Sequence, residues 1–198
     1  MQDCTGSQGS YISSATKNIQ LICDNICQSG KLQARDDLRV GLVAYRDHPP
    51  QDHTYVTRNF GFSSDIDKVH RDLSSLYASG GGDGPEAVTA GLAEALKMDW
   101  RESASKMIVL IADAPPHGVG EYGDGESAHS CLFFIFLFFF RANASSSWRR
   151  ACIHTPSSIW ELGFDDGSPD GNDPLVLARQ MATRGIVLVR VPVLALSK

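Results

Sequence analysis

The stretch MIVLIA at residues 107–112 decides the fold class of this chain. It is a continuous apolar run with neither helical nor alternating spacing, which is typical of a central parallel strand buried on both faces. A polar turn, DAPPHG at residues 113–118, ends it. Similar runs at residues 38–45 and 186–189 predict further strands, and residues 55–60 predict a weaker strand nearer an edge of the sheet.

Segments with helical spacing of apolar residues separate these strands. In the first, residues 11–28, Ser10 is expected to cap the helix. Its apolar stripe, expected to face the core, consists of Ile12, Ala15, Ile19, Ile22 and Ile26. Further helices are expected at residues 64–78, 86–97 and 174–184. The last has Asp173 as its cap and Gly185 as its stop. This alternation predicts an α/β fold, a doubly wound, mainly parallel sheet flanked by helices.

Composition and charge narrow the class of protein. A chain of 198 residues can bury one core, and a net charge of -5 argues against nucleic acid or an anionic membrane as a partner. The five cysteines show no metal-type spacing and are expected to be small buried residues in a reducing compartment. No signal peptide precedes the polar residues at the start, so a cytoplasmic location is expected.

Oxygen-bearing side chains cluster in three separated segments. Asp3, Thr5 and Ser7 alternate along an extended segment, so they can converge on one hard cation. Asp113 follows the central strand at the same predicted edge of the sheet. Carboxylates and hydroxyls suit Mg²⁺, Mn²⁺ or Ca²⁺, and Mg²⁺ is favoured because it keeps waters and needs few protein carboxylates.

Each of these segments also has a simpler interpretation. Asp3, Thr5 and Ser7 could shape a turn or cap the helix that follows. Asp113 could simply be the residue that ends its strand, without a role in binding. In the segment GGGDGPE at residues 80–86, Asp83 could be a turn residue and Glu86 a partner of the helix dipole.

Together, the segments DCTGS (3–7), GGGDGPE (80–86) and IADAPPHG (111–118) resemble a von Willebrand factor A domain. The likeness is to the subgroup of fungal and amoeboid proteins, some of which are attached to alpha-type protein kinases. The segment RVGLVAYRDHPP at residues 39–50 is similar to the same subgroup. The resemblance covers residues 1–125 and 163–189, which are expected to form a single domain.

The resemblance implies a metal-ion-dependent adhesion site at the carboxyl ends of the strands. Asp3, Thr5 and Ser7 would form its first loop and Asp113 its third. The second loop is similar to that of integrin β subunits, which implies Glu86 as a ligand. In that loop Asp83 would be a neighbouring or alternative ligand and Thr89 a weaker candidate.

The expected function is therefore a protein-interaction module. It would bind an acidic residue of a protein partner through the divalent cation, and no nucleophile–base pair points to an enzyme. One alternative is a metal-dependent phosphotransferase or hydrolase with Asp3 as nucleophile, although Thr5 stands where such a motif would have a second Asp. Another is a non-functional product, truncated at the first strand and at the C-terminus, since only Met1 and Gln2 precede Asp3.

One stretch, residues 126–162, departs from the pattern. It contains CLFFIFLFFF at residues 131–140, an apolar run without helical or alternating period that is too short to span a bilayer as a helix. The stretch is expected to be an anomalous insertion, either a translated intron or a disordered loop, with an interfacial membrane-binding insertion as the alternative. Residues 190–198 are expected to form an irregular tail.

Overall fold

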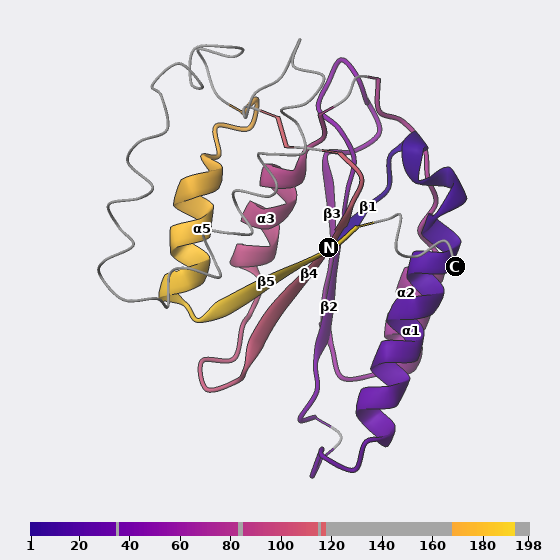
Figure 1. Cartoon of the computed structure of the whole chain (residues 1–198), viewed down its shortest axis with the longest axis vertical. Coiled ribbons are helices and arrows are strands. Elements are labelled where there is room, and N and C mark those ends of the chain that lie inside the picture. Colours follow the sequence, from indigo (N-terminus) through magenta and orange to yellow (C-terminus); the bar gives the residue numbers. More distant parts are fainter. Residues whose placement is uncertain (35, 83–84, 115, 118–167, 193–198) are drawn as a thin grey trace.

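A mixed sheet of five mostly parallel strands forms the centre of the protein. The computed structural model describes residues 1–34, 36–82, 85–114, 116–117 and 168–192. The strands are β1 (Gln2–Asp3), β2 (Val40–Tyr45), β3 (Thr57–Ser63), β4 (Lys106–Ala112) and β5 (Ile186–Pro192). Their order across the sheet is β3-β2-β1-β4-β5, and only β3 runs antiparallel to its neighbour (Figure 1). The predicted α/β class is confirmed at this level.

Helices lie on both faces of the sheet. The four α-helices of the described residues are α1 (Ile12–Gln28), α2 (Ile66–Ser74), α3 (Val88–Lys97) and α5 (Pro174–Thr183). Helices α3 and α5 pack together on one face, and α1 and α2 lie on the other (Figure 1). All four overlap the predicted helical segments. None of the described helices is both long and apolar enough to cross a membrane.

The helix ends follow the sequence in part. Asp173 caps α5 as predicted, since its side chain accepts a hydrogen bond from the amide of Leu175. The prediction that Ser10 caps α1 is wrong. Residues Gly6–Ser10 form a 3-10 turn, and Tyr11 stands at the cap position without a side-chain hydrogen bond.

The main core lies between the sheet and the α3–α5 layer. It contains alternate residues of β4, which are Ile108, Leu110 and Ala112, and these pack with Leu92, Leu96, Leu177 and Met181 from the helices. Because side chains on a strand alternate between faces, this layer accounts for one face of the MIVLIA stretch.

The other face of β4 is not buried along its whole length, contrary to the prediction. Met107 and Val109 are 59% and 37% exposed, and Val187 on β5 is 53% exposed. Only the carboxyl half is covered, where Ile111 packs on Ala15 of α1.

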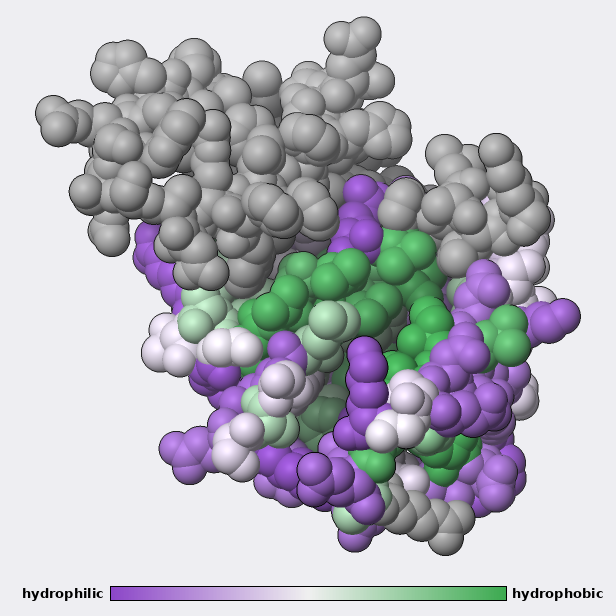
Figure 2. Space-filling view, turned by 60° about the horizontal axis from the view of Figure 1, so that its bottom comes forward, coloured by the Kyte–Doolittle hydropathy of each residue, from purple (hydrophilic) through white to green (hydrophobic). Residues whose placement is uncertain are grey.

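The apolar stripe of α1 is exposed in the same way. Ile12 and Ala15 are buried as predicted, but Ile22 and Ile26 are 56% and 39% exposed, so the prediction is wrong for them. The described residues supply no further element over this half of the face. Figure 2, seen from the lower end of the molecule, shows hydrophobic residues gathered in the middle of that surface.

Strand β1 has only two residues, yet it is the middle strand of the sheet. The amide of Cys4 donates to Tyr45 on one side at 2.9 Å, and the amide of Ile111 donates to Met1 on the other at 3.1 Å. The amino group of Met1 donates to the carbonyl of Val109 at 2.7 Å. Both sides of this short segment are therefore hydrogen-bonded.

Two predicted regions meet the limits of the described residues. The insertion expected at residues 126–162 lies outside them. The irregular tail predicted from residue 190 is wrong for residues 190–192, because β5 continues to Pro192 in register with β4. Residues 193–198 lie outside the described part.

The two faces of β4 should respond differently to truncation. Leu110→Ala should lower the free energy of unfolding by about 3 kcal/mol, because it leaves a cavity in the core. Met107→Ala should cost less than about 1 kcal/mol, because its side chain is largely exposed. Urea unfolding of both variants checks this, and equal losses would show that Met107 is packed in solution.

Candidate functional site

Asp3, Thr5, Ser7 and Asp113 form a connected cluster at the carboxyl ends of β1 and β4. The hydroxyl of Thr5 donates to Oδ1 of Asp3 at 2.8 Å, and the amide of Thr5 donates to the same atom at 2.9 Å. The hydroxyls of Thr5 and Ser7 lie 3.1 Å apart, and Ser7 donates to Oδ1 of Asp113 at 3.2 Å. The structure thus brings together these four sequence-predicted residues.

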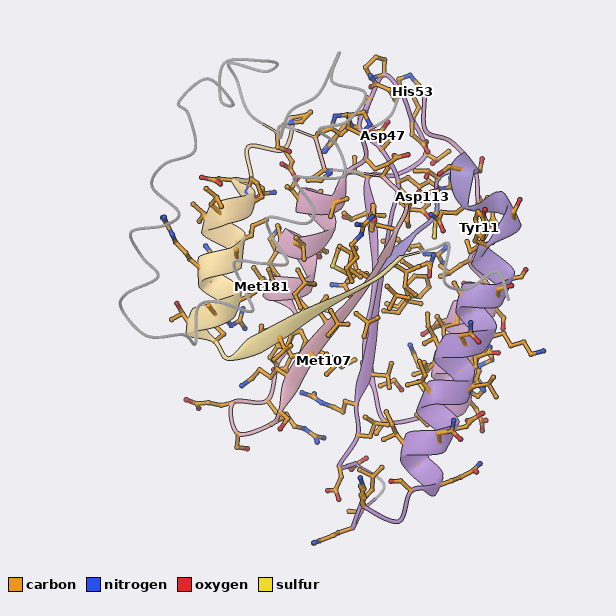
Figure 3. All side chains as sticks on the ribbon, viewed as in Figure 1. Tyr11, Asp47, His53, Met107, Asp113 and Met181 are labelled. Carbon is orange, nitrogen blue, oxygen red and sulfur yellow. The ribbon has the colours of Figure 1, made fainter. Side chains whose placement is uncertain are left out.

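The exposed side of the cluster is formed by Ser7 and Asp113. Asp3 and Thr5 are buried, whereas Ser7 and Asp113 are exposed. Figure 3 shows Asp113 and Asp47 near the same end of the sheet, with Met107 toward the other. A ligand could therefore reach the cluster past Ser7 and Asp113.

Glu86 joins the cluster from the segment before α3. It is 3% exposed, and its carbonyl accepts a hydrogen bond from the amide of His117 at 3.2 Å. Gly81 shows how close the side chains are. A Cβ added there would lie 3.3 Å from both Oε1 of Glu86 and Cβ of Thr5. Glycine at this position lets the loop pass over the two residues.

Of the remaining two candidates, Thr89 does not join the cluster. Asp83 lies outside the described residues. The hydroxyl of Thr89 lies 2.9 Å from that of Ser168 and within 3.4 Å of the carboxylate of Asp170. Thr89 therefore connects the first turn of α3 to residues 168–170 through its hydroxyl group.

The two buried carboxyl groups of the cluster have raised pKa values, and each has one oxygen without a hydrogen-bond donor in the described part of the chain. Burial raises the pKa of Asp3 from 3.8 to about 7, although the hydrogen bonds from Thr5 act in the opposite direction. Burial, and next the charges of Asp3 and Asp47, raise the pKa of Glu86 from 4.5 to about 9. Oδ2 of Asp3 and Oε2 of Glu86 have no hydrogen-bond partner among the described residues.

These unpartnered oxygens fit a hard cation. A buried carboxylate oxygen without a donor is costly, and a bound cation would satisfy it. The described residues contain no group of three or more histidine, cysteine or carboxylate side chains able to hold a metal ion. Binding would therefore depend on the hydroxyls of Thr5 and Ser7 as well as on the carboxylates.

A buried histidine–aspartate pair borders the cluster, and the sequence did not predict it. Nε2 of His117 lies 2.6 Å from Oδ1 of Asp47, and both side chains are buried. This contact links the segment after β2 to the segment after β4. Histidines in polar loops are usually expected to be solvated, but His48 and His117 are only 7% and 4% exposed.

Close packing against neighbouring residues accounts for glycine at residue 80. Gly80 has φ of 76°, and a Cβ there would lie 1.7 Å from Oδ2 of Asp52. Its carbonyl accepts a hydrogen bond from the amide of Gly6 at 2.9 Å. The run in the sequence indicates such an approach, but only the structure identifies Asp52 and Gly6 as the neighbours.

The chain resembles segments of two larger proteins. A scan against models of known protein families finds no match. The chain is 30% identical over 125 residues to the alpha-protein kinase vwkA of Dictyostelium discoideum, a match that covers 63% of this chain and 19% of the relative. It is 31% identical over 115 residues to the putative ariadne-like RING finger protein R811 of Acanthamoeba polyphaga mimivirus, with 58% and 10% covered. The chain thus spans a fifth or less of the length of these relatives.

The stability of the metal-free protein should depend on pH through Asp3. The unfolded chain ionises this group near pH 3.9 and the folded protein near 7, so between these values the unfolded state binds fewer protons. Stability should therefore fall as the pH rises from 5 to 7, by at most roughly 1.4 kcal/mol per pH unit relative to Asp3→Asn.

Urea unfolding of both proteins in EDTA measures this difference. The comparison with Asp3→Asn removes the contribution of the Met1 amino group, which both proteins share. It keeps the part of the Glu86 shift that the charge of Asp3 causes, and that part acts in the same direction. Parallel stability curves from pH 5 to 7 would show that Asp3 is not buried as described.

Proposed function

We propose that the chain is a von Willebrand factor A-type module that binds an acidic group of a protein partner through a divalent cation. The observation that carries this proposal is the pair of buried, unpartnered oxygens, Oδ2 of Asp3 and Oε2 of Glu86. They lie beside the hydroxyl of Thr5 in a cluster that opens toward Ser7 and Asp113.

The strand order supports a ligand site at this point. From β1 the chain proceeds to β2 and β3 on one side of the sheet, whereas β4 and β5 lie on the other. Ligands of open α/β sheets bind at the carboxyl ends of the strands where the order reverses in this way. Asp3 ends β1, and Asp113 directly follows β4.

The mixture of ligands supports a role in binding. Asp3, Thr5, Ser7, Asp113 and Glu86 would hold the cation, with Asp83 as a further candidate. Mg²⁺ is preferred, with Mn²⁺ or Ca²⁺ as alternatives. Because Mg²⁺ keeps several waters, a carboxylate of the partner could replace a water at the open side of the site.

A reducing, cytoplasmic setting belongs to the same proposal. Cys4, Cys23 and Cys27 are free thiols in the described structure, which suits such a compartment.

We propose no second function. A phosphotransferase or hydrolase that used Asp3 as nucleophile would need its carboxylate within reach of a substrate. Asp3 is 0% exposed, and its Oδ1 already accepts two hydrogen bonds from Thr5. The kinase and RING-finger names of the relatives describe proteins of which this chain matches only a small part.

Calorimetric titration of Mg²⁺ tests the proposal. The wild-type chain should bind Mg²⁺, and Asp3→Asn should bind at least about tenfold more weakly, which corresponds to 1.4 kcal/mol. Asparagine can still accept the hydrogen bonds from Thr5, so a folding defect is not expected.

Asp99→Asn is the matched control, because the Asp99 side chain is 94% exposed and pairs only with Arg39 in the described structure. Its affinity should equal that of the wild type. Equal affinity in Asp3→Asn would contradict the site, and no binding by the wild type would contradict the function.

A further inference from the structure

Arg46, the residue directly after β2, is a charged side chain with no exposed surface. Its guanidinium carbon lies over two aromatic rings, 4.6 Å from the centroid of Tyr55 and 4.7 Å from that of Tyr77. Burying a guanidinium is costly unless its charge and its donors are compensated. Nη1 and Nη2 of Arg46 have acceptors, whereas Nε has none among the described residues.

The donors of Arg46 connect two loops. Nη1 donates to the hydroxyl of Thr54 at 2.8 Å, and Nη2 donates to the carbonyl of Tyr77 at 3.2 Å. The carboxylate of Asp52 lies 4.0 Å from Nη1 and accepts hydrogen bonds from Thr54. Arg46 thus links the segment at residues 52–55 to the start of the glycine-rich loop.

The loop that Arg46 fixes at Tyr77 lines the candidate cation site. Two residues further on, the amide of Ser79 donates to the carbonyl of Cys4 at 3.0 Å. Gly80 then accepts from the amide of Gly6 at 2.9 Å. Residues 4–6 carry Thr5, so the position of this hydroxyl depends on the loop.

Arg46 also contacts the second side of the site through its backbone. Its carbonyl accepts a hydrogen bond from the amide of Ala87 at 3.0 Å, next to Glu86. The Glu86 segment is therefore bonded to the backbone at residue 46, a contact that a change of the Arg46 side chain leaves in place.

We propose that Arg46 is a positioning residue of the cation site, acting through the loop at residues 77–81. This inference rests on the proposed cation-binding function and deepens it. The planar fork of arginine can stack between two rings while it donates in two directions. Lysine keeps the positive charge but lacks the planar guanidinium with its two forked donors. Arg46→Lys should therefore remove the positioning contacts while it keeps the charge of the side chain.

Arg39 offers a matched control at the other end of β2. Its guanidinium lies 5.1 Å from the centroid of Phe62 and donates to the carbonyl of Asp99 at 2.7 Å. It therefore also combines a ring contact with a backbone acceptor, but it does not touch the loop. Arg39→Lys should change neither of the two measurements that follow.

The first measurement is the Mg²⁺ affinity of the folded protein. Arg46→Lys should bind Mg²⁺ at least about tenfold more weakly than the wild type. The second is amide hydrogen exchange in EDTA. In Arg46→Lys, the amides of Gly6 and Ser79 should exchange at least about tenfold faster, while that of Leu110 reports global unfolding.

Each outcome decides a different question. Wild-type affinity together with wild-type exchange in Arg46→Lys would overturn the inference. If the wild type binds no Mg²⁺, the proposed function fails, and exchange alone decides: faster exchange at Gly6 and Ser79 supports positioning, and unchanged exchange overturns it. If Arg46→Lys does not fold, Thr54→Val replaces it, because this variant removes one acceptor of the guanidinium and keeps the charge. It should show smaller changes in the same direction, and no change would overturn the inference.

Discussion

Residues Met1 to Asp3 join the two halves of the sheet, and the arrangement of the rest depends on this joint. In the described part of the chain, β2 and β4 do not pair with each other, and β1 pairs with both of them. The joint consists of backbone hydrogen bonds from a two-residue strand, assisted by the Met1 amino group. The contact of Asp47 with His117 crosses the same boundary at the carboxyl end.

The candidate site lies directly on the joint, so binding and folding involve the same atoms. Asp3 ends β1 and also has a buried oxygen without a partner. Burial of this carboxyl group opposes its ionisation, which weakens the folded state at neutral pH. On the proposed function, a cation would remove this penalty and add its binding free energy to the folded state. The protein would then be most stable when it is ready to bind its partner.

The sequence predicted patterns that depend on neighbours along the chain, and it failed where distant neighbours decide. The cap at Asp173 and the alternation of strands and helices are local signals, and both were correct. The predicted convergence of Asp3, Thr5 and Ser7 has another cause than alternation along an extended segment, because β1 ends at Asp3 and Ser7 lies in the 3-10 turn. The helical periodicity predicted that Ile22 faces the core. It could not show that none of the described elements covers this side chain. No local signal distinguishes the buried Arg46 from an ordinary residue at the end of a strand, because its ring partners lie on separate loops.

The exposed apolar side chains of β4, β5 and α1 also affect how the protein must be handled. Met107, Val187 and Ile22 are each more than half exposed in the folded state. A dye that fluoresces in apolar surroundings would bind this native surface, so a dye-based melting curve would begin bright and could not be interpreted as unfolding. Circular dichroism or intrinsic tryptophan fluorescence avoids this problem, since neither signal depends on dye binding to the surface.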